Sequence, residues 1–157
     1  MKKSLFLLLT LCCSLFVFAS CGGDDDNTAG ASNVVGTYNG PLGVTVNGVS
    51  TGDAVNYPIV IKATSNNTIT LSIANFSFSS MNLGNFLIKD CNCTYANGVY
   101  TLTGTTSVSV NLLGAAIACP TQITGTITND KAILSITITV PSLNQTVVVN
   151  YTGSKNV

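Results

Sequence analysis

The chain has 157 residues, six lysines, six aspartates and no net formal charge, and it contains no histidine or tryptophan. It also lacks arginine and glutamate, and the four lysines beyond residue 20 are scattered, which excludes the clustered basic surface of a nucleic-acid binder. Without histidine, the usual serine and cysteine catalytic triads cannot be assembled.

The N-terminal residues predict export. Two lysines precede an apolar run from Leu5 to Ala19, which is shorter than the ~20 residues of a bilayer-spanning helix and is typical of a secretory signal peptide. Cys21 follows Ala19 and Ser20 directly. The sequence therefore divides into a signal peptide at 1–20, a flexible acidic tether at 21–32 and a folded domain at 33–157.

The residues around Cys21 resemble the lipobox of bacterial lipoproteins. The resemblance implies that Cys21 is lipidated and becomes the mature N-terminus, so that the membrane is a partner through this anchor. The run Asp24, Asp25 and Asp26 resembles the export tag of Bacteroidota-type surface lipoproteins. The implied location is the outer membrane with the domain exposed at the cell surface, and a domain facing the periplasm is the alternative.

Beyond the tether, apolar and polar residues alternate with the period of two that is typical of half-buried strands. Eight strands are predicted, at 34–46, 57–63, 69–78, 86–93, 100–112, 123–127, 134–140 and 147–151. A change of parity near Ala74 and Asn75 predicts a bulge. The segment 79–85 is expected to be a loop, and 112–118 an unusually apolar connection.

Eight strands without a convincing helix predict an all-β domain, an antiparallel up-and-down meander that closes into a barrel. The long first strand can bend at Gly36, Gly40 and Gly43 and pair at both ends. A Greek-key sandwich is the alternative. The apolar face is expected inside, and a transmembrane barrel would instead turn it toward lipid.

The opening Gly36-Thr37-Tyr38-Asn39-Gly40 and the long first strand resemble the calycin-like β-barrel domain of Bacteroidota lipoproteins, a domain similar to lipocalins. The resemblance covers about Val34 to Tyr151 and implies an eight-stranded barrel. Lipocalins carry a tryptophan in this motif and an arginine on the last strand. Here Tyr38 replaces the tryptophan and the sequence has no arginine. The contact between these two side chains, which closes one end of a lipocalin barrel, is therefore not expected.

Catalysis and cofactor binding are not expected from the remaining charged residues. Outside the tether the only acids are Asp53, Asp90 and Asp130. Asp130 is in a tight turn and Asp53 in a Gly-flanked loop, where aspartate commonly bonds to the backbone. The sequence therefore predicts a protein that is not an enzyme and carries no cofactor.

Three cysteines remain in the folded domain, Cys91, Cys93 and Cys119. In an exported protein a disulfide joining Cys93 or Cys91 to Cys119 is a candidate, although the expected strand register places Cys119 far from that pair. The alternative is that all three fill inward positions as small hydrophobes. Three thiols without a fourth ligand do not make a convincing metal site.

Two apolar segments are candidates for a ligand-binding mouth: Phe76, Phe78, Met81 and Leu83 in the first, and Leu112, Leu113 and Ile117 in the second. They would admit a small apolar or neutral ligand, with small inward residues at Gly36, Gly40, Ala63 and Gly104 leaving room. The alternative is a packed barrel, an interaction module that contacts protein or glycan through its loops. In that case the two apolar segments would only complete the hydrophobic core at one end of the barrel.

Overall fold

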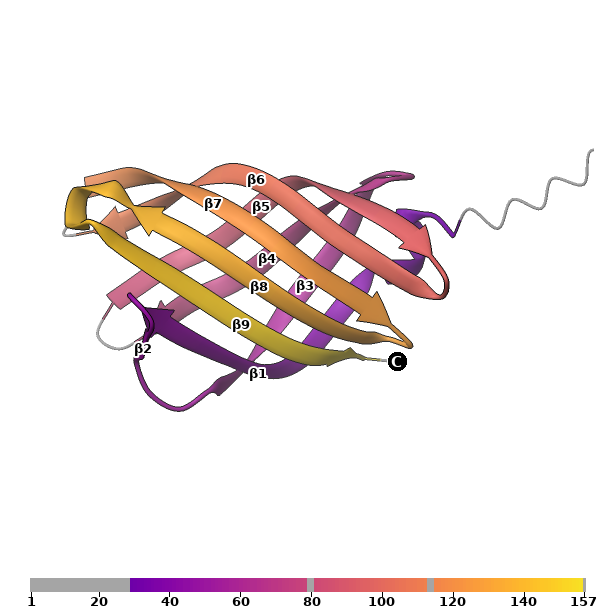
Figure 1. Ribbon diagram of the computed structural model, residues 1–157, viewed down its shortest axis with the longest axis horizontal. Coiled ribbons are helices and arrows are strands. Elements are labelled where there is room, and N and C mark those ends of the chain that lie inside the picture. The colour runs from indigo at the N-terminus through magenta and orange to yellow at the C-terminus, as the bar shows by residue number, and fades with distance from the viewer. Residues whose placement is uncertain (1–28, 79–80, 113–114, 157) are drawn as a thin grey trace, which may run out of the picture.

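Figure 1 shows the computed structural model, which describes residues 29–78, 81–112 and 115–156. The described chain forms one antiparallel sheet preceded by a short 3-10 helix. In chain order the elements are η2 (Ala31–Val34), β1 (Gly36–Val46), β2 (Val49–Ser50), β3 (Val55–Ser65), β4 (Thr68–Phe78), β5 (Met81–Ala96), β6 (Val99–Leu112), β7 (Ala115–Thr128), β8 (Lys131–Val140), η3 (Pro141–Leu143) and β9 (Gln145–Lys155).

The sheet closes into a barrel. Its strand order is β2-β1-β3-β4-β5-β6-β7-β8-β9, and an additional pairing joins β1 to β9. Figure 1 shows β1 and β9 side by side along one edge of the molecule. The predicted up-and-down barrel of eight long strands is confirmed, and the Greek-key sandwich is not formed. The two-residue β2 is an addition that the sequence pattern did not predict.

Strand β1 makes the closure by pairing on both sides. It pairs with β3 from Gly36 to Leu42. It also pairs with β9 at Tyr38 and Asn39 and again from Leu42 to Val46. Between the two stretches, a Cβ added at Gly40 would contact the Thr152 carbonyl oxygen and lie 2.6 Å from the Gly153 Cα. The bend predicted for the first strand is therefore present, and Gly40 permits the close approach of β9.

The inward face carries the apolar core, as the alternation predicts. Strand β8 illustrates the pattern, because Ala132, Leu134, Ile136, Ile138 and Val140 are buried while their sequence neighbours are partly or fully exposed. Among the described residues, Thr121 is the only buried polar or charged residue. Its hydroxyl donates to the Cys119 carbonyl at 3.1 Å, so this polar group is satisfied within its own strand.

One end of the barrel is closed by η2. Ala31 and Val34 are buried against the core, and the Ala31 N–H donates to the Asn66 carbonyl at 2.7 Å. The Tyr38 hydroxyl donates to the Val34 carbonyl at 3.0 Å. Val34 was expected to begin the first strand, and that expectation is wrong because Val34 ends this helical turn. The tyrosine in the position of the lipocalin tryptophan thus bonds to an element that the sequence did not indicate.

Two predicted connections are mostly strand. Strand β5 begins at Met81, within the expected loop at 79–85. Strands β6 and β7 pair as far as Leu112 with Ala115, so residues 115–118 of the expected connection belong to β7, and residues 113–114 lie outside the described residues. The predicted bulge is present: the register of β4 on β5 shifts between Ile73 and Phe76, and Asn75 has φ +50°.

Substitution of Gly40 tests the closure, with Gly43 on the same strand as control. We expect Gly40→Ala to lower the free energy of unfolding by about 1–3 kcal/mol because the methyl group meets the backbone of β9. Gly43→Ala should change stability by less than ~0.5 kcal/mol, since its Cβ would meet only the Ala54 Cβ, at 3.9 Å. Urea unfolding measures both. Equal stability of the two variants would contradict this account of the closure.

Candidate functional site

The interior of the barrel is filled by its own side chains. Strands β3 to β7 contribute inward residues with 0% exposed surface, namely Ile59, Ile61, Ile69, Leu71, Ile88, Leu102 and Ile123. Side chains that line a cavity wide enough for a ligand would have exposed surface, and these side chains have none. Packing of this kind is that of an ordinary protein core.

The small inward residues do not provide the expected room. The inner side of Gly40 is occupied by the backbone of β9. A Cβ at Gly104 would lie 3.1 Å from the Cys91 Sγ and 3.2 Å from the Ile123 Cγ2, and one at Gly36 would lie 2.7 Å from the Lys155 Cε. Ala63 is exposed and does not line the interior. These glycines allow close approach of neighbouring groups instead of leaving a void.

The end of the barrel opposite η2 is a mouth with an apolar rim. Here Val46, Tyr57 and Ile117 pack on the core and remain partly exposed. The Tyr57 ring meets the buried Phe76 ring edge-on at a centroid distance of 5.8 Å, and its hydroxyl donates to the Ser77 carbonyl at 3.1 Å. Aromatic packing at Phe76 therefore covers part of the core at this end.

The predicted ligand-binding residues are brought to this end only in part. Phe76 is buried in the core beneath the mouth, and Ile117 lies opposite Val110 near the end of β7. The side chains of Phe78, Met81, Leu83 and Leu112 are not among those described, and Leu113 lies outside the described residues. Their role in binding stays a prediction.

The three cysteines are free thiols, and all are buried. The candidate Cys93–Cys119 disulfide is not formed, for a reason of register. Cys93 lies opposite Leu102 of β6, whereas Cys119 lies opposite Val108. Six residues along a strand span about 20 Å, and a disulfide requires Cα atoms within ~7 Å. The three cysteines instead occupy buried inward positions as small hydrophobic side chains, which is the alternative that the sequence left open.

Burial also suppresses the reactivity of these thiols. It raises the pKa of Cys91 to about 11, with a smaller contribution from the negative charge of Asp90. Burial raises the pKa of Cys93 and of Cys119 as well. Within the described residues no group of three or more histidines, cysteines or acids is placed to hold a metal ion.

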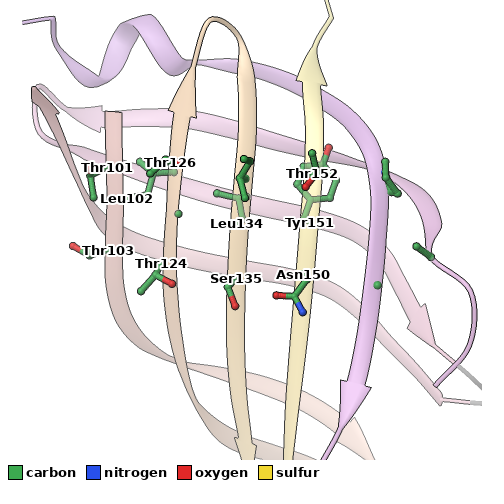
Figure 2. A pocket seen from close by; sticks show the side chains of 15 residues that line it. Thr101, Leu102, Thr103, Thr124, Thr126, Leu134, Ser135, Asn150, Tyr151 and Thr152 are labelled. Carbon is green, nitrogen blue, oxygen red and sulfur yellow. The ribbon is translucent and has the colours of Figure 1, made fainter. Parts of the chain in front are cut away.

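A groove of about 670 Å³ crosses the outer wall of the barrel from β6 to β1. Figure 2 shows its polar side chains in two rows, with Thr103, Thr124, Ser135 and Asn150 in one row. The strand register aligns them, because each of these residues is the direct partner of the next. The second row follows in the same way through Thr101, Thr126, Ile133 and Thr152.

The groove is uncharged and combines hydroxyl groups with apolar surface. Its other lining residues are Pro41, Gly43, Ala54, Leu102, Gly125, Leu134 and Tyr151. Leu102, Leu134 and Tyr151 are buried inward-facing residues, so they belong to its floor. Ile133 is 52% exposed at its centre. The sequence contains the signal for this site as Thr-x-Thr at 101–103 and 124–126, but only the strand register shows that the two repeats align.

A smaller and more polar groove of about 340 Å³ lies where β5 meets β6 and β7. Asp90, Asn92, Thr105 and Gln122 are among its lining residues, and Asp90 has φ +55°. Of the other two predicted aspartates, Asp130 lies 3.9 Å from the Lys155 Nζ. Asp53 is in the loop between β2 and β3, so the three acids lie on separate elements.

The fold and its motif define a calycin-like barrel, and comparison with known proteins agrees. The model of the calycin-like β-barrel domain family matches residues 34–154, so the chain belongs to this family. No curated protein matches the chain. Of the described helices, none has the length and apolar character needed to cross a membrane.

A solved structure with the same fold comes from Bacteroides fragilis and is described as a "putative outer membrane protein". It superposes with a TM-score of 0.66 at 23% sequence identity. The match covers 80% of this chain and 52% of that one, so this chain spans about half the length of that protein. At this identity the likeness shows the shared fold.

Thiol counting tests the state of the three cysteines in a soluble chain that begins at Gly22 and therefore lacks Cys21. At pH 8 the folded protein should react negligibly with Ellman's reagent within minutes, because thiols with raised pKa values remain protonated and buried. In guanidinium chloride three thiols should react. The exposed Val49→Cys variant should react at once when folded. A single reactive thiol after denaturation would reveal a disulfide.

Proposed function

We propose that this protein is a lipid-anchored, non-enzymatic binding lipoprotein of the bacterial envelope, and that its packed barrel binds its partner on the outside. The observation that carries the proposal is the complete burial of the isoleucine and leucine side chains that β3 to β7 turn inward at the middle of the barrel. A barrel with a filled interior is a rigid support, and its outer wall and loops are the surfaces left for recognition.

The anchor in this proposal is Cys21, which lies outside the described residues, as do Asp24, Asp25 and Asp26. Nine residues separate Cys21 from Ala31, the start of η2. Fully extended, they would reach about 30 Å, enough to hold the barrel clear of the lipid headgroups. The acidic run favours exposure at the cell surface over the periplasm, and the Bacteroides fragilis protein is consistent with an outer-membrane location.

The second candidate function is that of a carrier for a small apolar or neutral ligand. The observation that favours it is the apolar rim of the mouth, where Val46, Tyr57 and Ile117 stay partly exposed. The base of the mouth at Phe76 is closed by ring packing. A ligand there would sit in the mouth itself and extend into the segments that follow Phe76 and Leu112.

The Cys21→Ser variant tests the anchor. Without the acylated thiol the protein loses the membrane affinity that acyl chains provide, so it should move from the membrane pellet to the soluble fraction after cell lysis. Wild-type protein should remain in the pellet through a high-salt wash. A Cys21→Ser protein that still pelleted would contradict the lipoprotein assignment.

Native mass spectrometry separates the two candidate functions. The described elements and their backbone hydrogen bonds lie between Gly30 and Asn156, so a soluble chain starting at Gly22 contains them all. Purified without detergent from its source bacterium, it should show its own mass alone, because the interior is filled. A reproducible added mass below about 1 kDa that is lost on denaturation would overturn the packed-barrel proposal in favour of the carrier.

A further inference from the structure

We propose that the groove on the outer wall, across β6, β7, β8, β9 and β1, is a binding site for a neutral glycan. This inference rests on the proposed function, because it specifies where and what the outside of the barrel binds. None of the mouth residues Val46, Tyr57, Phe76 and Ile117 lines this groove. It is built from outward side chains that the strand register places in two parallel rows (Figure 2).

The polar groups of the groove are available to a ligand. Apart from the buried Tyr151, its polar side chains are six hydroxyl groups and one amide, those of Thr101, Thr103, Thr124, Thr126, Ser135, Thr152 and Asn150. None of these seven side chains has a hydrogen-bond partner within the described residues. Hydroxyl groups both donate and accept, and the amide does the same, so the surface matches a ligand that is itself rich in hydroxyls.

The charge of the groove selects against ionic ligands. No lysine or aspartate lines it. An anionic ligand such as a phosphate or an acidic sugar would need basic partners, and a cation would need carboxylates. Burying either charge against neutral hydroxyls would leave it without a counter-charge. The preferred ligand is therefore neutral.

A peptide added as an extra strand is also disfavoured. Each of the three central strands of the groove is paired on both sides. Strand β7 lies between β6 and β8, β8 lies between β7 and β9, and β9 lies between β8 and β1. Their backbone groups are used in the barrel ladders, so no free edge remains for strand addition. Recognition has to proceed through the side chains.

The apolar surface of the groove also suits a sugar ligand. Ile133 is half exposed between Thr126 and Thr152, and Pro41 and Ala54 lie on the β1 side. A sugar ring presents C–H groups as well as hydroxyls, so such a mixed surface can contact both. The groove volume of about 670 Å³ is within the ~300–1,000 Å³ typical of sites for small ligands.

The test is a titration of the soluble chain from Gly22 with maltohexaose, cellohexaose, xylohexaose and mannohexaose, followed by ¹⁵N NMR. At least one of these neutral oligosaccharides should bind saturably and shift the amide signals of the groove residues. Hexagalacturonate serves as the charged probe and should not bind.

Two lysine variants on the same strand provide the matched pair. Ser135 lines the groove and Thr137, two residues further on, does not, although both are partly exposed outward residues. Ser135→Lys should weaken binding at least tenfold, because a long charged side chain fills the groove. Thr137→Lys should bind within twofold of the wild type. Unfolding in urea checks that both variants are folded.

Three results would overturn the inference: no binding to any of the four neutral probes, binding that survives Ser135→Lys, or binding of hexagalacturonate alone. None of them bears on the anchor or on the packed interior, which cell fractionation and native mass spectrometry test separately. Failure of the glycan site is therefore distinguishable from failure of the proposed function.

Discussion

The closure of β1 on β9 is the constraint on which the rest of the structure depends. It requires two backbones to approach closely at Gly40, where the carbonyl of Thr152 occupies the place of a side chain. On β9 the missing side chain of Gly153 leaves room for the Tyr151 ring, whose hydroxyl donates to the Tyr57 carbonyl at 3.3 Å. Closure pairs the first and last long strands, which would otherwise be the two edges of the sheet.

A closed barrel of eight strands is just wide enough for its side chains to fill, and the bulky isoleucines and leucines of β3 to β7 fill it. The cap at η2 and the ring packing at Phe76 complete the two ends of this core. A filled interior and paired strands leave side-chain chemistry on the outer wall as the means of recognition. The binding proposal thus follows from the same packing that stabilises the fold.

The strands could be predicted because one buried face makes the period of two visible, as at Leu134, Ile136 and Ile138. The prediction failed where the pattern does not alternate. The segment 112–118 is apolar without alternation, so it predicted a connection, although Leu112 belongs to β6 and residues 115–118 belong to β7. The turn at η2 contains two polar residues between Ala31 and Val34 and carries no periodic signal. The outer groove could not be predicted, since its rows exist only once the registers of three strand pairs are known.

Composition links the fold to the proposed ligand. Threonine has a branched side chain that suits a strand, and its hydroxyl and methyl groups face outward on the wall of a barrel. The threonines at 101, 103, 124 and 126 therefore favour strands β6 and β7 and at the same time form the polar surface of the groove. No lysine or aspartate lines the groove, so it offers no counter-charge to an ionic ligand. It retains what a neutral, hydroxyl-rich partner requires, which is a rigid wall of aligned hydroxyl groups.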